Sequence, residues 1–234
     1  MSRRTRVAVA AAATLLTTLP VVALTSTSAS ASRPAGYGPS HPFDSELMGD
    51  TGIPEPMKNL AKIDRDRYGY LVTAGQQNSH MTIPLVNRGH GLRFADTGTQ
   101  KWKRLASGCN AQHVRRGVAA VCKVPASTSL RNPTLLTLHP RIGNDFIDGH
   151  SLPARFQLAV LCDEGNYTVF AGHGNDFVNG AQDVDHIHGG AGKDWIRGGK
   201  ADDKIWGDAS NDYLVGQYGR DYINGGTGAD RIYQ

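Results

Sequence analysis

Apolar residues are spaced most regularly near the end of the chain, where a large aliphatic residue recurs at every ninth position. From Ala171 to Tyr233 the chain divides without a gap into seven nine-residue units, and the eighth place of each is aliphatic. These residues are Val178, Ile187, Ile196, Ile205, Leu214, Ile223 and Ile232. A fixed short period of this kind predicts a solenoid, in which each unit buries its apolar side chain only against neighbouring units.

The polar residues of these units keep the same register. The sixth place is always aspartate: Asp176, Asp185, Asp194, Asp203, Asp212, Asp221 and Asp230. Glycines are frequent in the segment before each aspartate, among them Gly172, Gly174, Gly190, Gly192, Gly226 and Gly228. Glycine permits positive φ and lets the backbone come close to an ion. Calcium takes about six to eight oxygens from carboxylates and backbone carbonyls. These aspartates and glycines are therefore the predicted metal-binding residues.

The unit Gly189–Arg197 fits the pattern G-G-x-G-x-D-x-U-x, where U is a large aliphatic residue. It resembles the hemolysin-type (RTX) calcium-binding nonapeptide repeat. The resemblance implies a right-handed parallel β-roll with two nonapeptides per coil, so that each unit stacks on the unit two places further along. A Gly/Asp-rich β-helix without metal is the alternative, and it is disfavoured because stacked carboxylates without a cation repel one another.

In the roll that the resemblance implies, calcium sits between stacked turns and takes aspartate from both, which gives about five ions. On a first edge the pairs are Asp176/Asp194, Asp194/Asp212 and Asp212/Asp230, and on a second edge they are Asp185/Asp203 and Asp203/Asp221. The fourth place, where glycine helps most, holds Asp183, Ala201 and Ser210 in three units. Because two of these three precede second-edge aspartates, we expect the Asp185/Asp203 site to be the weakest.

Residues 67–170 are predicted to form a β-rich lead-in region to the roll at 171–234. Short apolar or alternating runs occupy 68–74, 81–86, 92–95, 117–123, 135–139, 156–161 and 167–170, and most are separated by Gly, Asn, Asp or Pro. This region resembles the lead-in of secreted actinobacterial calcium-binding repeat proteins, which implies an irregular parallel β-helix that runs into the roll. The residues that carry the resemblance are Ala74-Gly75, Asn78, Asp96, Gly108-Cys109, Cys122 and Gly143-Asn144-Asp145. The Asp145 half-motif is out of phase with the seven units, and an extra calcium there is left open.

The N-terminal part of the chain predicts export. Arg3, Arg4 and Arg6 precede an apolar run, and Ala29-Ser30-Ala31 offers a cleavage site, so residues 1–31 are interpreted as a signal peptide. The mature protein is then expected to be secreted, either free or associated with the cell wall. An uncleaved membrane anchor is the alternative, which the threonines and proline within the run disfavour. Residues 32–66 are expected to be loosely ordered, with one short helix at 57–63.

Three cysteines in an exported chain predict one disulfide and one further thiol. Cys109 and Cys122 are 13 residues apart across an expected turn and are the predicted pair. Cys162 lies in an apolar run, where a buried thiol is favoured over an intermolecular bridge.

Composition and motifs narrow the function. Residues 171–234 hold 6 Lys/Arg against 10 Asp/Glu, whereas the positive charge of residues 32–170 is scattered, which argues against nucleic-acid binding. The chain contains neither H-E-x-x-H nor G-x-S-x-G. We therefore predict a calcium-binding structural or binding module without catalysis. The alternative is a secreted hydrolase whose unrecognised active site lies in 32–170.

Aromatic side chains suggest a further surface. The seventh place of alternate units carries Phe177, Trp195 and Tyr213, which we expect to stack as an outward ladder. Such stacking stabilises a sheet by itself, and a contact strip for a cell-wall or extracellular glycan is the sharper alternative. His186 and His188 flank an inward isoleucine and are interpreted as surface residues rather than metal ligands.

Overall fold

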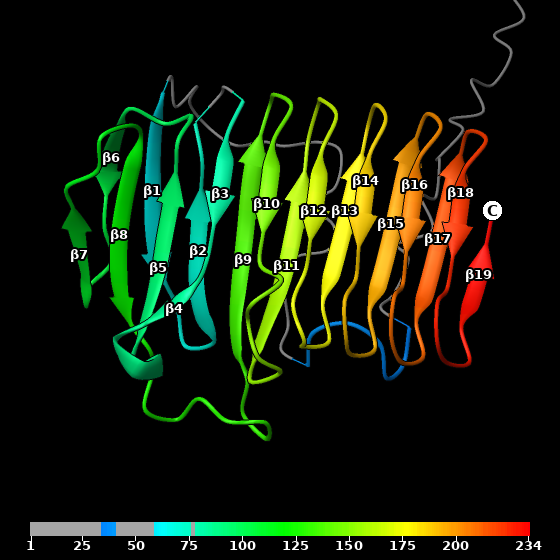
Figure 1. Cartoon of the computed structure of the whole chain (residues 1–234), viewed down its shortest axis with the longest axis horizontal. Helices are drawn as coiled ribbons and strands as arrows, with labels where there is room; N and C mark the ends of the chain where they lie inside the picture. Colours follow the sequence, from blue (N-terminus) through cyan, green and yellow to red (C-terminus); the bar gives the residue numbers. More distant parts are fainter. Residues whose placement is uncertain (1–33, 41–58, 76–77) are drawn as a thin grey trace, which may run out of the picture. The chain divides into compact units, whose positions relative to one another are not determined.

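In the computed structural model, two β-sheets face each other, and the chain alternates between them (Figure 1). The structure describes residues 34–40, 59–75 and 78–234. Sheet A contains β1 (Leu60–Arg65), β2 (Gly69–Thr73), β6 (Lys101–Arg104), β9 (Thr134–Arg141), β11 (Phe156–Cys162), β13 (Phe177–Ala181), β15 (Trp195–Lys200), β17 (Tyr213–Tyr218) and β19 (Arg231–Tyr233). Sheet B contains β3 (His80–Thr82), β4 (Leu85–Val86), β5 (Gly91–Asp96), β7 (Cys109–Gln112), β8 (Val118–Lys123), β10 (Phe146–Asp148), β12 (Thr168–Phe170), β14 (His186–His188), β16 (Lys204–Trp206) and β18 (Tyr222–Asn224). A short 3₁₀ turn, η1 (Asn87–Gly89), follows β4.

From β9 to β19 the strands form a parallel solenoid of about six turns, in residues 134–233. Phe177 pairs with Trp195, Trp195 with Tyr213, and Tyr213 with Arg231, so one coil contains two nonapeptides as predicted. The parallel coils begin at β9, inside the region that the sequence assigns to the lead-in. The earlier start reflects the fully buried run of β11 and the largely buried run of β9, which supply the same inward side chains without the nine-residue period.

The predicted aliphatic column fills the space between the two sheets. Val178, Ile187, Ile196, Ile205 and Leu214 are all fully buried. Ile232 at the same place is 47% exposed, because β19 is the edge strand of sheet A among the described residues. Each coil therefore depends on its neighbours for burial, as expected of a solenoid.

Residues 60–123 have a different architecture, in which antiparallel pairs predominate. β1 pairs with β2, and β5 pairs with β3, β4 and β8, all antiparallel. This antiparallel region joins the solenoid through two parallel pairings, β2 with β9 and β3 with β10. The predicted β-helix-like lead-in is thus β-rich but mixed in strand direction.

The expected helix at 57–63 is wrong in the residues that the structure describes. Leu60–Arg65 is strand β1, with Ala61 and Ile63 buried and the residues between them more exposed. This alternation has the period of a strand. Asp66 then accepts hydrogen bonds from the backbone N–H groups of Tyr68 and Gly69, both at 2.8 Å, which turns the chain into β2.

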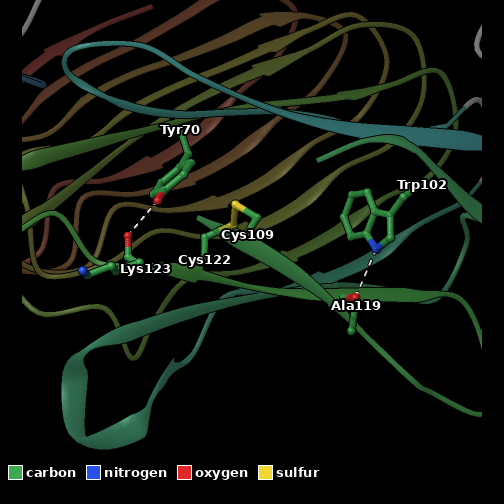
Figure 2. The surroundings of a disulfide bond; sticks show 6 residues. All are labelled: Tyr70, Trp102, Cys109, Ala119, Cys122 and Lys123. Carbon is green, nitrogen blue, oxygen red and sulfur yellow. Dashed lines mark hydrogen bonds between the residues drawn. A yellow bond between two sulfur atoms is a disulfide. The ribbon is translucent and has the colours of Figure 1, made fainter. Parts of the chain in front are cut away.

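The predicted disulfide is confirmed. Cys109 and Cys122 face each other on β7 and β8 and are joined by a bond between their sulfur atoms (Figure 2). Nearby, the Tyr70 hydroxyl donates to the Lys123 carbonyl at 2.7 Å, and Trp102 Nε1 donates to the Ala119 carbonyl at 3.1 Å. Cys162 is a buried free thiol, also as predicted.

The aromatic ladder forms on the outer face of sheet A, but it is covered. The rings of Phe177 and Trp195 lie 4.5 Å apart and are almost completely buried. The segment 34–40 lies over them: Gly38 N–H donates to the Lys193 carbonyl at 2.7 Å, and the Tyr37 ring contacts Tyr213 at 5.7 Å. Phe177 and Trp195 are therefore not accessible to a glycan, the alternative considered for this ladder, and their stacking fits the favoured structural interpretation.

The predicted signal peptide, residues 1–31, lies outside the described residues. Within the described part of the chain, no helix is long and apolar enough to cross a membrane.

Candidate metal centre

The repeat aspartates lie in two columns, one at each edge of the coils. Each aspartate immediately precedes a strand. First-edge residues precede β13, β15, β17 and β19, and second-edge residues precede β14, β16 and β18. The side chains of Asp176, Asp185, Asp194, Asp203 and Asp212 are at most 1% exposed. Carboxylates are rarely buried this completely unless a partner compensates for the lost hydration.

Hydrogen bonds join every predicted stacked pair. In each case Oδ1 of one aspartate accepts a bond from the backbone N–H of the aspartate 18 residues earlier, at 2.8 to 2.9 Å. These bonds join Asp176 to Asp194, Asp194 to Asp212, Asp212 to Asp230, Asp185 to Asp203, and Asp203 to Asp221. The geometry thus brings together all five pairs that the sequence predicted.

The second carboxylate oxygen of four repeat aspartates is buried without a partner. This holds for Oδ2 of Asp185, Asp194, Asp203 and Asp212. A buried polar group left without a hydrogen bond costs about 1–3 kcal/mol, and more when it is charged. The protein therefore holds a series of anionic oxygens for which it supplies no donor. A divalent cation with hard oxygen ligands fits this donor set.

Burial changes the acidity of these carboxyl groups. Desolvation is the largest cause in each case, and it raises the pKa of Asp185 to about 9 and those of Asp203 and Asp212 to about 7. The pKa of Asp194 is raised well above its usual value, first by burial and then by the neighbouring Asp176 carboxylate. A bound cation would reverse this effect by stabilising the ionised form.

Glycine at the first place of the second to seventh units is a requirement that the sequence interpretation missed. A Cβ atom on Gly180 would lie 2.2 Å from Asp185 Oδ2 and 2.3 Å from the Gly198 carbonyl oxygen. The same contact with the carboxylate of the same unit occurs at Gly189, Gly198, Gly207, Gly216 and Gly225, at 2.1 to 2.5 Å. The space beside each unpartnered oxygen is therefore too small for any side chain. The signal was present in the sequence, because six of the seven units begin with glycine.

The glycines predicted at the second and fourth places shape the turns. Gly190 and Gly192 have φ of +94° and +122°, and a Cβ on either would lie about 2 Å from a carbonyl oxygen of the preceding coil. Where the sequence departs from glycine, the backbone keeps this conformation: Ala181, Asp183, Ala201, Asp208, Ser210 and Gln217 all have φ between 64° and 89°. Four of these six lie in second-edge turns. The strain is therefore concentrated on the edge expected to bind more weakly.

The first unit differs from the others. Both carboxylate oxygens of Asp176 are hydrogen-bonded, Oδ1 to the Leu158 N–H at 2.7 Å and Oδ2 to the Gly172 N–H at 2.8 Å. Asp176 is thus satisfied by the protein itself. At the other end of the solenoid, Asp221 and Asp230 are only partly buried.

Asp145 occupies the second-edge column although it is out of phase in the sequence. It precedes β10, which is separated from β14 by β12 alone. Tyr167 takes the aspartate place before β12, and its N–H donates to Asp185 Oδ1 at 2.7 Å. Asp145 carries the fifth unpartnered Oδ2. The coil between Asp145 and Tyr167 is longer than 18 residues, which explains why Asp145 is out of phase with the nine-residue period of the repeats.

An ion at these edges needs backbone carbonyl oxygens as ligands in addition to carboxylate oxygens. Among the described residues, no three His, Cys, Asp or Glu side chains group around one point. His186 and His188 are both partly buried. His188 Nδ1 lies 3.1 Å from Asp208 Oδ2, and its ring stacks on Trp206 with an interplanar angle of 3°. Carboxylates combined with turn carbonyls are the ligand set that calcium uses.

Parallel coils with buried carboxylate columns and glycine turns define the class, a calcium-binding β-solenoid. A family model of the RTX calcium-binding nonapeptide repeat matches the chain in four copies, at residues 163–187, 179–214, 188–222 and 206–233. Residues 163–233 are therefore RTX repeats, as the resemblance predicted, and RTX repeats bind Ca²⁺. The match covers less than a third of the chain. Comparison of the chain with curated proteins and with solved structures found no match.

Proposed function

We propose that this chain is a secreted protein whose C-terminal repeats fold on binding several calcium ions, and that it acts outside the cell as a structural or binding module without catalysis. One observation carries the calcium part: Oδ2 of Asp185, Asp194, Asp203 and Asp212 is buried without a donor. Calcium at these turns would supply the missing positive charge and would link adjacent coils.

Two features support secretion. The signal-peptide pattern of residues 1–31 is one. The Cys109–Cys122 disulfide is the other, because such bonds persist in oxidising compartments. Outside the cell, millimolar calcium is available to fold the repeats, whereas calcium is scarce in the cytosol. Folding would then be coupled to export.

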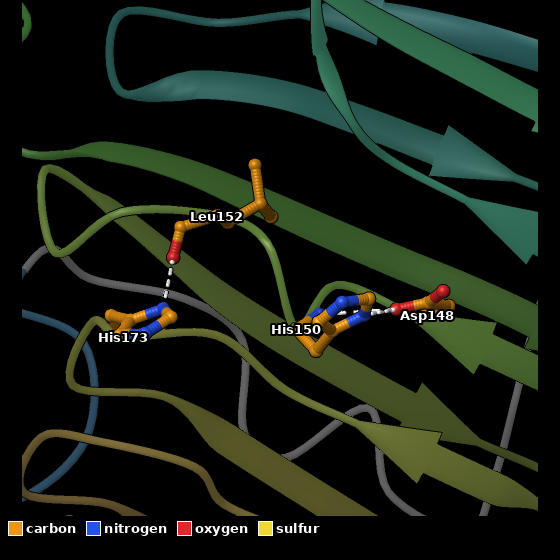
Figure 3. Close-up of polar contacts among 4 residues, drawn as sticks. All are labelled: Asp148, His150, Leu152 and His173. Carbon is orange, nitrogen blue, oxygen red and sulfur yellow. Dashed lines mark hydrogen bonds and ion pairs between the residues drawn. The ribbon is translucent and has the colours of Figure 1, made fainter.

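The described residues offer the hydrolase alternative one acid–histidine pair within 32–170, because Asp148 Oδ1 contacts His150 Nδ1 (Figure 3). His150 and His173 line a cavity of about 280 Å³, but no serine, threonine or cysteine lines it as a nucleophile. A cavity of about 780 Å³ opens in the antiparallel region and is lined by Asn78, Thr97, Gly98, Thr99, Gln100, Arg116 and Gly117. This lining contains no carboxylate, histidine or cysteine that could act as a general base or nucleophile.

We include a cell-wall or extracellular glycan as the partner of the module. Because the ladder on sheet A is covered, its support is the exposed tyrosines of the last coils, Tyr218 at 73% and Tyr222 at 54%. Tyrosine combines an apolar ring with a polar hydroxyl and suits contact with carbohydrate. A glycan array probed with calcium-loaded protein, and with a Tyr218→Ser/Tyr222→Ser variant, tests this part separately.

A calcium titration tests the main proposal. The far-ultraviolet circular dichroism of residues 32–234 is recorded in chelator, in magnesium and in rising calcium. We expect β-structure to increase cooperatively with calcium but not with magnesium, which demands near-octahedral geometry. The same β-spectrum in chelator and in millimolar calcium would refute folding on calcium binding.

A further inference from the structure

Asp145 carries a buried anionic oxygen outside the matched repeats, which begin at residue 163. The side chain is 2% exposed. Its Oδ1 accepts a hydrogen bond from the Ser79 backbone N–H at 2.6 Å, whereas its Oδ2 has no partner. The site thus repeats the arrangement of the RTX aspartates but lies next to a different part of the chain.

A second buried carboxylate adjoins it. Asp96 is also 2% exposed, and the Ser79 hydroxyl donates to its Oδ2 at 3.1 Å. The Gly98 N–H donates to Asp96 Oδ1 at 2.9 Å, and the Thr99 hydroxyl donates to Oδ2. None of the hydrogen bonds that Asp145 and Asp96 accept here comes from a lysine or an arginine.

The two carboxylates lie where the antiparallel region meets the first parallel coil. Asp145 precedes β10, Ser79 precedes β3, and Asp96 ends β5. β3 pairs with β10 on one side and with β5 on the other. The cavity of about 780 Å³ lies beside this pair: it is lined by Asn78 and Thr97, which adjoin Ser79 and Asp96 in the chain, and by Gly98 and Thr99, which hydrogen-bond Asp96.

We propose that Asp145 and Asp96 hold a cation that joins β3 and β5 of the antiparallel region to β10 of the solenoid. The ligand atoms that Asp145 and Asp96 offer are all oxygens, which favour a hard cation. Ca²⁺ is such a cation, and RTX repeats bind it. This site rests on the proposed function, since it uses the same extracellular calcium. It extends calcium binding beyond the repeats and couples the stability of the two regions.

The substitution Asp145→Asn separates this proposal from a protonated, metal-free carboxyl group. Asparagine has nearly the same shape and keeps an oxygen to accept the Ser79 N–H, but it removes the charge. At a cation site the variant loses an ion. At a metal-free site it replaces one neutral buried group with another of similar shape, and stability stays the same or increases.

The experiment counts bound calcium in residues 32–234 by equilibrium dialysis and elemental analysis, and follows amide hydrogen exchange in 80–96. We expect Asp145→Asn to bind one calcium fewer per chain than the wild type and to exchange faster at β3 and β5. Asp163→Asn removes a carboxylate outside both columns and should change neither. If Asp145→Asn does not fold, Asp96→Asn should show the same loss of one ion. An unchanged ion count with equal or greater protection would overturn the proposal alone, whereas a wild type that binds no calcium would overturn the proposed function as well.

Discussion

The antiparallel region (60–123) and the solenoid (134–233) bury their residues in opposite ways. In the antiparallel region, large side chains such as Tyr70, Ile83, Leu92 and Phe94 fill the core, and a disulfide closes one hairpin. In the RTX coils each unit contributes one aliphatic side chain toward the space between the sheets, while four aspartates, Asp185, Asp194, Asp203 and Asp212, are buried at the edges without full hydrogen bonding. The core of the first region is apolar, whereas the second region also buries carboxylates that suit a cation.

The difference shows that one β-architecture can obtain its stability from two sources. Apolar burial gives about 25 cal/mol per Å² and needs no ligand. Paired carboxylates do not stabilise the fold until a cation binds them. Their contribution to the free energy of unfolding then depends on the cation concentration. Experiments that separate the two sources test this comparison directly.

Removing calcium should give the largest effect, and mainly in the solenoid. If each of five repeat sites binds with a dissociation constant near roughly 0.1 mM, then 1 mM calcium adds about 1.4 kcal/mol per site, or about 7 kcal/mol in all. We expect amide exchange in 171–234 to become fast in chelator, while 60–73 and 109–123, which lie outside the strands joined by the proposed Asp145 site, stay protected. Equal loss of protection in both regions would show that they fold as one unit.

Single aspartate substitutions should rank the calcium sites. Asp194→Ala and Asp212→Ala each remove a ligand from two first-edge pairs, so we expect the largest increases in the calcium midpoint of folding. Asp185→Ala affects one pair, on the edge with more strained turns, and should have a smaller effect. Circular dichroism titrations measure the midpoints, with Asp163→Ala as the matched control. Equal midpoints for Asp185→Ala and Asp194→Ala would disprove the ranking of the two edges.

Removing the Cys109–Cys122 disulfide should destabilise the antiparallel region rather than the solenoid. Closing a loop of 13 residues is worth about 3 kcal/mol in the chain-entropy model. The Cys109→Ser/Cys122→Ser variant should therefore lose about that much stability in the antiparallel region, measured by hydrogen exchange at β5, β7 and β8 in saturating calcium. The calcium midpoint of 171–234 should stay unchanged, and a large increase would mean that this hairpin supports the repeats.

The effect of pH should have opposite signs with and without calcium. The pKa values of Asp185, Asp203 and Asp212 are raised to about 9, 7 and 7 in the folded chain, so the metal-free fold binds more protons than the unfolded chain. Its stability should be greatest near the ordinary aspartate pKa and should be lost as the pH rises through 7 to 9. Calcium requires ionised carboxylates, so its midpoint should fall by up to about tenfold per pH unit for each proton released.

Urea unfolding in chelator and calcium titrations, both at pH 5, 7 and 9, check these two trends. A calcium midpoint that does not change with pH would contradict the burial of protonated carboxyl groups.

Relieving backbone strain should give the smallest effect, and it should be favourable. Gln217 has φ of 83°, a conformation that costs about 1–2 kcal/mol for a residue with a side chain. Gln217→Gly should stabilise the calcium-bound roll by up to about 1 kcal/mol, because the added flexibility of the unfolded chain offsets part of the gain. Ala229→Gly, at a place without positive φ, should destabilise slightly. Thermal unfolding in saturating calcium measures both changes.

The repeat region was predictable because its contacts are set by sequence spacing. Every aspartate pair joined by a hydrogen bond is 18 residues apart, and every fully buried aliphatic side chain of the repeats lies in the predicted column. In a solenoid each unit touches only its neighbours, so the period alone specifies register, inward side chains and stacked carboxylates. The first-place glycines were equally visible in the sequence but were not recognised as a requirement.

Contacts between distant segments could be decided only by the tertiary structure. The covering of Trp195 by residues 37–40 joins segments more than 150 residues apart, and no period marks it. Asp145 enters the second-edge column because a coil of irregular length restores the register in space while losing it in the sequence. Leu60–Arg65 forms a strand because β2 and β6 pair with it. The sequence thus determined the repeating contacts between neighbours, whereas folding decided which surfaces are covered and how the antiparallel region meets the solenoid.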